Sequence, residues 1–555
     1  MLSDVEIARS VKPAPIDAIA KTLGISADHL HPYGKDKAKI DLSVLAQPRR
    51  QKTPARLILV SAITPTPAGE GKTTTTIGLG QALARLGESV CLALREPSLG
   101  PCMGVKGGAT GGGYSQIVPM ESINLHFTGD FHAVTAAHNL LAAALDNRIH
   151  HGDLPIDPRR VLWRRVIDMN DRSLRNTLIG LGGVNQGVPR ETGFDITAAS
   201  EVMAMLCLAT DLENLRERID RLLVAFTFDG VPVTAAELGV TGAMLALLKD
   251  ALMPNLVQTL EGVPALVHGG PFANIAHGCN SLLATQMALH VADWVITEAG
   301  FGFDLGAEKF FDIKCAGAGL DTAAVVLVAT ARALKMHGGV RRRKLNESNP
   351  QAIADGLPNL AKHIESIRHF TETPVVALNR FADDTDDELA VVEAYCKEAG
   401  VPFAISDHFA RGGEGAEQLA RAVLENAEVE SKPFTRLYHW ADSIEDKIAA
   451  VGEKMYGAKS VEYTRQARKA IKEANRLGYG KLPICIAKTQ NSLSDNPRLR
   501  GRPTDFDITV SDVRVNAGAG FLVIMTGDIM RMPGLPRRPQ AEDIDVVDGK
   551  IVGLS

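Results

Sequence analysis

Residues 57–76 have the sequence LILVSAITPTPAGEGKTTTT, in which a strand, a loop and the start of a helix follow one another directly. The apolar run Leu57–Ile63 is typical of a strand buried in a parallel sheet. A Pro/Gly loop comes next, and the spacing then predicts a helix over 73–86 that Gly87 can end in the left-handed conformation. Ser89–Leu94 is the next apolar run. This order predicts an α/β fold with a mostly parallel sheet.

The later part of the chain continues the same alternation. Pro374–Asn379 and Val401–Ser406 have the composition of further strands, and a helix is predicted between them from Asp386. Two shifts of composition indicate boundaries between folding units. One is the basic, polar stretch Arg341–Pro350, which we interpret as an exposed connection, and the other lies near Val429–Phe434.

The composition excludes several classes of protein. The chain has 555 residues, and its 60 Lys and Arg against 65 Asp and Glu give a net charge of −5. This balance does not support a dedicated nucleic-acid binder or a polybasic membrane-surface protein. The apolar runs fall short of the ~20 residues that cross a bilayer, and Asp4 and Glu6 stand where a secretory signal needs basic residues. We therefore expect a cytoplasmic protein without a membrane span, whose seven scattered cysteines are free, buried thiols.

The loop after the first strand predicts a site for a nucleotide. A strand, a glycine-containing loop and a helix N-terminus surround a phosphate chain with backbone N–H groups. The Lys72 side chain would reach the terminal phosphates, and the Thr73 hydroxyl would hold magnesium. Thr66 stands where the pattern G-x-x-x-x-G-K-[ST] has its first glycine, but the later glycines are in place. The predicted nucleotide-binding residues are Thr66, Pro67, Ala68, Gly69, Glu70, Gly71, Lys72 and Thr73.

Two features follow the second predicted strand. Arg95 emerges at its carboxyl end, where open α/β sheets bind ligands. A guanidinium there can hold a planar carboxylate or an acyl phosphate through two hydrogen bonds, and a surface ion pair is the simpler alternative. The segment Gly104–Tyr114 has six glycines in eleven residues. We interpret it as a loop that lets the backbone approach a ligand or another segment closely.

His126, Asp130 and His132 lie within seven residues of one another. Their spacing is superficially that of a metal site, but a helical H-x-x-x-H pattern and a third distant ligand are missing. Histidines bonded to the backbone are the default interpretation. A proton-handling pair beside the phosphates is the alternative.

Taken together, these segments resemble the formate–tetrahydrofolate ligase family. The glycine-rich segment and VATARALKMHGG are the most diagnostic stretches, and the matching segments span nearly the whole chain in one order. They are TPAGEGKTT (Thr66–Thr74), REPSLGP (Arg95–Pro101), GVKGGATGGGY (Gly104–Tyr114), PMESINLHFTGDFHA (Pro119–Ala133), RETGFDITAASE (Arg190–Glu201), EAGFGFDLGAEKFFDIKC (Glu298–Cys315), VATARALKMHGG (Val328–Gly339) and KLPICIAKTQNSLSD (Lys481–Asp495).

The resemblance implies a reaction and an architecture. ATP, formate and tetrahydrofolate would give 10-formyltetrahydrofolate, ADP and phosphate through a formyl phosphate intermediate. Magnesium and a monovalent cation, potassium or ammonium, would take part, and the protein would be a homotetramer. The implied fold is a P-loop-type domain with two smaller α/β domains packed against it. With the boundaries above, these are a nucleotide- and formate-binding domain over 1–345, a domain contributing to the folate site over 346–430 and a C-terminal domain over 431–555.

The resemblance also implies roles for single residues. Arg95 would hold the formyl phosphate, and Glu96 would help to form the monovalent-cation site. His126 and Asp130 would lie near the reacting centre, and which of them accepts the amine proton stays open. Phe381 and Phe409 would sandwich the pterin ring of the folate; ordinary core positions are the alternative. Phe409 occupies a position that is often Trp in the family.

Two other functions share part of this pattern. Another P-loop ligase that phosphorylates a carboxylate before amine attack would use the same loop and arginine but would not require the aromatic pair. A nucleotide switch or partitioning-type ATPase would hydrolyse ATP without formate and folate. Dependence of ATP turnover on both of those substrates separates the three functions.

Overall fold

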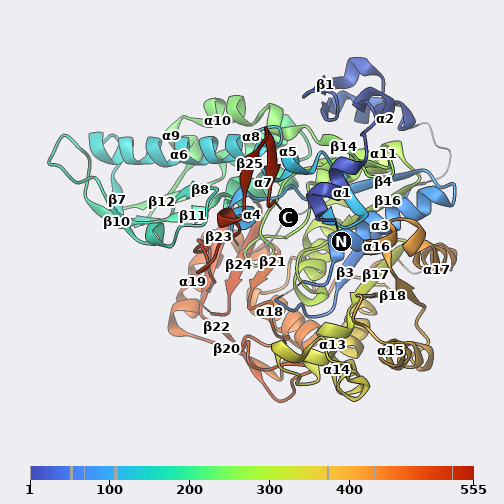
Figure 1. Cartoon of the computed structure of the whole chain (residues 1–555). Helices are drawn as coiled ribbons and strands as arrows, with labels where there is room; N and C mark the ends of the chain where they lie inside the picture. The colour runs from blue at the N-terminus through green and yellow to red at the C-terminus, as the bar shows by residue number, and fades with distance from the viewer. Residues whose placement is uncertain are drawn as a thin grey trace.

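The computed structural model describes residues 2–49, 54–67, 69–104, 110–371, 374–429, 433–527 and 529–554. Within these residues the chain forms a mixed, twelve-stranded sheet (Figure 1). Its parallel part has the order β15 (Pro264–Val267), β4 (Val90–Leu94), β16 (Trp294–Glu298), β3 (Arg56–Ala62), β17 (Ala324–Ala329), β18 (Pro374–Asn379) and β19 (Phe403–Ser406). Beyond β15 the sheet continues with antiparallel strands, namely β14 (Asn255–Thr259), β2 (Ala38–Ile40), β1 (Leu30–Pro32), β6 (Ser115–Val118) and β5 (Gly111–Gly112).

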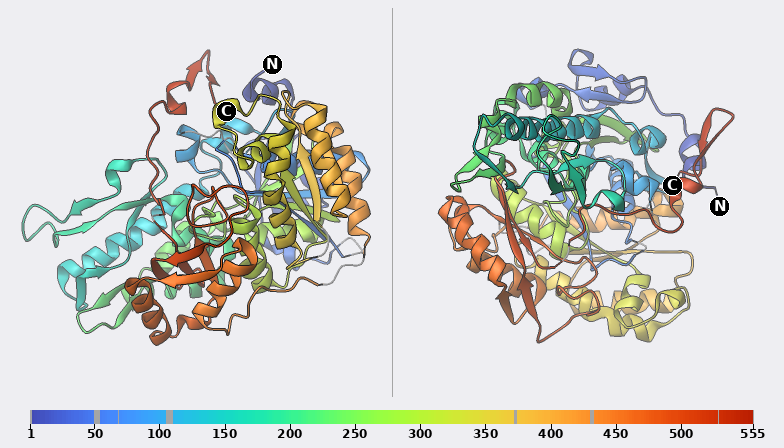
Figure 2. Two further views of the ribbon diagram at one scale, coloured as in Figure 1. Left: turned by 90° about the horizontal axis from the view of Figure 1, so that it is seen from below. Right: turned by 90° about the vertical axis from the view of Figure 1, so that its left-hand side faces the viewer.

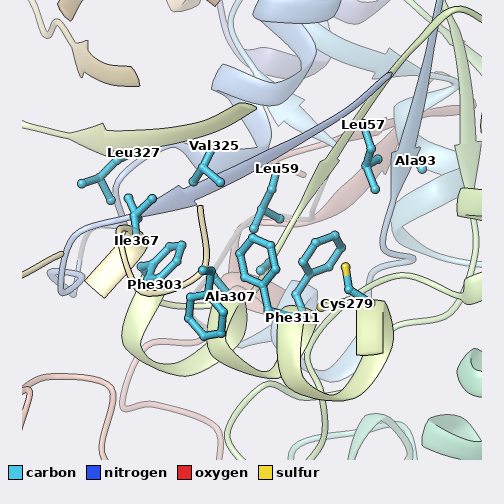
Figure 3. Close-up of a cluster of buried hydrophobic side chains, with 14 of the residues drawn as sticks. Leu57, Leu59, Ala93, Cys279, Phe303, Ala307, Phe311, Val325, Leu327 and Ile367 are labelled. Atoms are coloured by element: carbon cyan, nitrogen blue, oxygen red, sulfur yellow. The ribbon is translucent and has the colours of Figure 1, made fainter. Parts of the chain in front are cut away.

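The predicted mostly parallel α/β architecture is confirmed, and its strands are apolar because both faces of the sheet are covered. Along β3, Leu57 and Leu59 belong to one core cluster, whereas Ile58 and Val60 belong to the other. Side chains alternate between faces along a strand, so a strand buried on both faces needs an apolar residue at each position. Figure 3 shows the first of these faces, where Leu57 and Leu59 point from β3 toward the phenylalanine rings that belong to the same cluster.

Helices cover the two faces of the sheet. On one face lie α3 (Lys72–Arg85) and α17 (Glu417–Ala427). On the other lie α11 (Leu282–Val291), α13 (Ala331–His337), α14 (Pro350–Ile367), α15 (Asp386–Glu398) and the π-helical turns η6 (Phe303–Ala307) and η7 (Phe310–Cys315). In the part of the chain that the structure describes, no helix is long and apolar enough to cross a membrane.

The predicted boundary at residue 345 does not coincide with a break in the sheet. β18 and β19 continue the sheet beside β17, so the strands of residues 346–430 belong to the large sheet. The basic stretch Arg341–Pro350 connects α13 to α14, which pack so closely that a Cβ on Gly356 would overlap the backbone of Leu334. Polar composition here marks an exposed connection inside one unit, since connections lie at the surface wherever they occur.

A lobe with its own core is inserted between β6 and β14, and it projects to one side of the molecule (Figures 1 and 2). Its helices are α6 (Asp130–His151), α7 (Glu201–Leu208), α8 (Leu212–Asp220), α9 (Ala235–Leu238) and α10 (Thr241–Leu248). They pack on the sheet β13 (Pro232–Thr234), β12 (Leu223–Thr227) and β7 (Ile156–Val161). Two strand pairs complete the lobe, β8 (Arg165–Ile167) with β11 (Phe194–Ile196) and β9 (Thr177–Ile179) with β10 (Arg190–Thr192).

The C-terminal part of the chain adds small sheets and then returns to the N-terminal helix. The sheets are β21 (Ile484–Ala487), β24 (Phe521–Met525) and β23 (Asp512–Asn516), and β20 (Ser460–Tyr463) with β22 (Asp507–Val510). They pack with α18 (Ile444–Val451) and α19 (Arg465–Arg476). The hairpin of β25 (Asp545–Val547) and β26 (Lys550–Val552) follows. Leu554 then packs with Val5 of α1 (Asp4–Ser10) and Met120 of α5 (Met120–Asn124).

The cysteines are unpaired thiols inside the protein, as their spacing predicts. All seven are buried and free. Burial raises the pKa of the Cys91 thiol in the central sheet to about 12. Such thiols are structural residues with little thiolate character at neutral pH.

Candidate active site

The carboxyl ends of the parallel strands meet at one edge of the sheet, and the loop over residues 64–71 lies there. It leaves β3 after Ala62 and enters α3 at Lys72. β4 ends directly before Arg95, and β16, between β3 and β4, ends at Glu298. Ligands bind at this edge in open α/β sheets. The structure therefore places the 64–71 loop and Arg95 at the same edge.

Glycines fix the backbone of the 64–71 loop. Gly69 and Gly71 have positive φ values of 80° and 74°. A Cβ on Gly71 would also overlap the side-chain amide of Asn379, which donates a hydrogen bond to the carbonyl oxygen of Glu70 at 3.1 Å. Glycine is therefore required at position 71 on two grounds. In the described residues no side chain caps the first turn of α3, so its N–H groups suit an anion.

Glu70 braces this loop from inside the protein. Its side chain is buried, and its two oxygens accept hydrogen bonds from the Thr66 N–H at 2.6 Å and the Thr330 hydroxyl at 2.5 Å. Glu70 thus ties the loop to the start of α13. The backbone at Thr66 does not have a positive φ, which explains why threonine fits where the general pattern has glycine. Pro67 is exposed, and Ala68 lies outside the described residues.

Glu298 contacts both Thr73, in the first turn of α3, and Arg95, which the sequence predicts to bind a carboxylate. The Thr73 hydroxyl donates a hydrogen bond to Glu298 Oε2 at 2.7 Å. Glu298 Oε1 lies 3.4 Å from Arg95 Nε and 3.5 Å from its Nη2. The Glu298 side chain is 1% exposed, whereas that of Arg95 is 23% exposed and so accessible to a ligand. The sequence left open a surface ion pair for Arg95. The structure instead pairs Arg95 with a buried carboxylate and leaves part of the Arg95 side chain exposed.

Glu298 is not among the site residues predicted from the sequence. A usable signal is present, because an acidic residue at the end of the buried run Trp294–Glu298 is at a strand's carboxyl end. That signal depends on knowing that β16 lies between β3 and β4, a long-range pairing that no local pattern states.

Glu96 is a buried carboxyl, one oxygen of which has no hydrogen-bond partner among the described residues. It is 5% exposed, and within the described residues its Oε2 has no hydrogen-bond partner. Burial raises its pKa well above the ordinary range, and the neighbouring charge of Asp130 raises it further, while Lys39 acts in the opposite sense. A bound cation would relieve both effects. The residue fits the cation site that the family resemblance implies for it.

The Asp130 carboxylate is buried and bound by other side chains of the protein. It is the first residue of α6 and is 2% exposed. Its oxygens lie 2.7 and 2.9 Å from Lys39 Nζ, and the Asn255 side-chain amide donates to it at 2.8 Å. Lys39, on β2, is a residue of this site that sequence reasoning misses, because its strand pairs with β14 more than two hundred residues later. These contacts hold the carboxylate in a fixed orientation.

His126 differs from Asp130 in its surroundings. His126 is exposed. Among the described residues, no hydrogen bond joins the side chains of His126 and Asp130. His132 is also exposed. Across the described ranges, no group of three or more His, Cys, Asp or Glu is placed to hold a metal ion. His126 and Asp130 thus lie in one segment without forming a direct proton-transfer pair.

A protein-family model described as formate–tetrahydrofolate ligase matches residues 2–555, essentially the whole chain. The chain belongs to the formate–tetrahydrofolate ligase family. It is therefore a carbon–nitrogen ligase of one-carbon metabolism that joins formate to tetrahydrofolate at the expense of ATP. The resemblance seen in the sequence is confirmed.

The predicted folate-binding phenylalanines of this ligase follow neighbouring strands. Phe381 lies two residues after β18 and Phe409 three residues after β19, and the two strands are parallel neighbours. Neither ring belongs to the buried core clusters of the described residues. Phe381 is partly buried with the Arg332 guanidinium carbon 4.3 Å from its ring centroid, and Phe409 is 43% exposed. Neither phenylalanine therefore occupies an ordinary core position.

Part of the glycine-rich segment of the ligase supports Phe409. Residues 105–109 lie outside the described residues, whereas Gly111–Gly112 pairs with β6. The backbone N–H of Tyr114 donates to the carbonyl oxygen of Phe409 at 2.9 Å, and a Cβ on Gly113 would overlap that carbonyl. Glycine at position 113 therefore permits the close approach of this turn to α16 (His408–Arg411).

Proposed function

We propose that this ligase activates formate as formyl phosphate. A formate oxygen attacks the γ-phosphorus of ATP, the bond from that phosphorus to the bridging oxygen of ADP breaks, and ADP leaves. The N10 amine of tetrahydrofolate then attacks the formyl carbon, phosphate leaves with the former formate oxygen, and the amine loses its proton. One observation carries the proposal: Thr73, in the first turn of α3, and Arg95 both contact a single carboxylate, Glu298.

The 64–71 loop and the start of α3 supply the nucleotide part of the proposed site. The positive φ of Gly71 and the uncapped N–H groups of α3 suit phosphate oxygens. Lys72, the first residue of α3, would contact the transferred phosphoryl group. Thr73 would hold magnesium, whose bound charge neutralises the phosphates; its hydroxyl oxygen keeps lone pairs for a cation because its proton is donated to Glu298.

Arg95 is the proposed formate and formyl phosphate residue. A guanidinium binds a carboxylate through two parallel hydrogen bonds of about 2.8 Å, which is shorter than its 3.4 Å contact with Glu298. Formate would therefore form the better pair. Since the transferring group carries developing negative charge, a fixed cation beside it stabilises the transition state more than the ground state.

The remaining proposed roles concern cations, the proton and the folate. Glu96 would take part in a monovalent-cation site, because its buried Oε2 has no hydrogen-bond partner in the part of the chain that the structure describes. Asp130 is held by Lys39, whereas His126 is exposed, so we assign the amine proton to His126 or to water. Phe381 and Phe409 would stack on the pterin. We also propose the homotetramer, on the family resemblance, with sedimentation of the ligase as its test.

Heavy-oxygen labelling tests the formyl phosphate route. If formate labelled with heavy oxygen is supplied with unlabelled ATP, the route requires one label in each phosphate released by the complete reaction. Phosphate is analysed by mass spectrometry, and omission of tetrahydrofolate gives the background. Unlabelled phosphate at full turnover would overturn the route. Acetate in place of formate tests the alternative of a general carboxylate-activating ligase, which would turn over ATP with both acids.

A further inference from the structure

Glu298 contacts both the first turn of α3 and Arg95. In the sheet, Glu298 is paired with Val60 of β3, while its neighbour Thr297 is paired with Ala93 of β4. The side chain is almost completely buried, and its two oxygens are divided between two partners. Oε2 accepts from Thr73, and Oε1 faces Arg95.

The contact with Thr73 fixes the direction of a hydroxyl. A threonine hydroxyl has one proton to donate and two lone pairs, whereas an ionised carboxylate only accepts. The 2.7 Å hydrogen bond therefore commits the Thr73 proton to Glu298. The lone pairs of Thr73 Oγ1 are left for a cation. Without Glu298 the hydroxyl could rotate and present its proton to the cation instead.

The contact with Arg95 is weaker and leaves the arginine able to bind. Its distances of 3.4 and 3.5 Å exceed those of an ordinary charge-assisted hydrogen bond, and Arg95 Nε is buried without a hydrogen-bond partner among the described residues. Gly300 leaves the space for the guanidinium, since a Cβ there would lie 3.0 Å from Arg95 Nη1. Glu298 thus holds the arginine near the loop without saturating it.

We propose that Glu298 is a positioning residue that couples formate binding to binding of the magnesium nucleotide. The inference rests on the proposed function of Thr73 and Arg95. When a formate carboxylate takes over the Arg95 guanidinium, Glu298 is less neutralised, and its negative charge acts more strongly on the cation beside Thr73. Formate should therefore tighten the magnesium nucleotide, and by thermodynamic linkage the magnesium nucleotide should tighten formate by the same factor.

Calorimetry of ADP binding tests this coupling without turnover. The ADP affinity of the whole protein is measured with and without magnesium, and each with and without formate. In the natural protein, formate should tighten magnesium–ADP about fivefold or more and leave magnesium-free ADP nearly unchanged. Glu298→Gln keeps the shape but removes the charge. It should abolish the effect of formate and reduce the enhancement by magnesium about tenfold.

A matched variant separates positioning from stability. Glu388 is also fully buried, is paired with Lys335 at 2.8 Å and accepts a hydrogen bond from the Asn349 N–H at 2.8 Å, but it lies on α15. Glu388→Gln should lower the melting temperature and leave the formate effect on magnesium–ADP intact. Thr73→Ser, which keeps the hydroxyl, should retain the coupling, and Thr73→Val should lose it.

The measurements on the Glu298 and Thr73 variants can support the coupling or overturn it. A folded Glu298→Gln protein that keeps both the formate effect and the magnesium enhancement would overturn the proposal. If that variant does not fold, persistence of the formate effect in Thr73→Val would overturn it, and its loss beside an intact Thr73→Ser would support it. Label transfer from formate to phosphate in the natural protein is measured separately, so failure of the phosphate route and failure of the coupling can be distinguished.

Discussion

Arg95 shows how much of this site depends on the geometry of one side chain. Its planar guanidinium has a long contact with Glu298 and is partly open to solvent. A lysine at this position would keep the charge but offer a point cation on a flexible stem. The proposed binding of formate therefore depends on shape as well as on charge.

We expect Arg95→Lys to lower kcat/KM for formate at least about a hundredfold, because the paired hydrogen bonds to a carboxylate are lost. ADP affinity, measured by calorimetry, should change little. A parallel loss of ADP affinity would place Arg95 in the nucleotide site and not in the formate site.

His138 is one of several buried histidines that make stability depend on pH. Its Nδ1 faces the Ser200 hydroxyl at 2.8 Å and its Nε2 the Arg164 carbonyl oxygen at 3.0 Å, and its ring stacks on Trp163. Burial lowers its pKa to about 3, so the folded protein keeps it neutral. The unfolded chain binds a proton at pH values below the ordinary pKa of about 6.5, and stability is therefore lost as the pH falls from about 6.5 toward 3. Burial also lowers the pKa of His268, His277, His363 and His408.

Between about pH 5.5 and its own lowered pKa, each of these histidines should remove about 1.4 kcal/mol of stability per pH unit. Urea unfolding of the natural protein and of His138→Gln at pH 5, 6 and 7.5 checks this. The variant should be less stable at pH 7.5 but show a shallower decline toward pH 5. An equal decline in both proteins would mean that His138 is protonated in the folded state.

At the scale of elements, the junction of β3 with α3 is the most constrained segment of the site. Gly71 meets two requirements at once, a left-handed backbone and contact with the Asn379 amide. Gly87, at the other end of α3, has a φ of 94°, and a Cβ there would meet no atom of another described segment within 4 Å. Gly87 is therefore a control for Gly71, because both have a positive φ but only Gly71 has a neighbouring side chain that a Cβ would overlap.

Gly71→Ala should weaken ADP binding more than tenfold, since the loop must move away from Asn379. Gly87→Ala should cost about 1–2 kcal/mol of stability from backbone strain and leave ADP binding unchanged. Calorimetry and thermal unfolding of both variants give the comparison. Unchanged ADP binding in Gly71→Ala would show that the 64–71 loop does not hold the nucleotide.

The ends of β18 and β19 carry the proposed pterin site. Phe409→Ala should raise KM for tetrahydrofolate by about five- to a hundredfold, as expected for loss of one stacking ring, with little change for ATP or formate. Phe409→Trp should leave that KM unchanged or lower it, because the larger ring offers more stacking area. Steady-state kinetics with each substrate varied in turn is the measurement. Similar effects on all three substrates would place the pterin elsewhere.

The sequence predicts these elements unevenly. β3, β4, β18 and β19 are apolar runs of ordinary strand length between turn residues, so a local pattern identifies them. Lys39 and Glu298 are not predicted, because each reaches the site through strand pairing across a large part of the chain. The 64–71 loop lies between these cases: its glycines are visible in the sequence, but their contact with Asn379 is not.

At the scale of the whole molecule, one sheet carries both the nucleotide loop and the proposed folate residues. The sequence suggested a separate unit over 346–430 because a basic, polar stretch precedes it. The structure continues the sheet across that stretch through β17, β18 and β19. A connection inside a unit and a linker between units have the same composition, so local polarity could not distinguish them.

The buried thiols can be used to detect which part of the protein opens first. A thiol-reactive dye should leave the native protein unlabelled and react only where the structure opens, because burial withholds the thiolate. Cys91 lies in the central sheet, Cys207 in the inserted lobe and Cys485 on strand β21 of the C-terminal part. Mass spectrometry of the first modified peptide in mild urea would identify which of the three regions opens first, with no cysteine introduced.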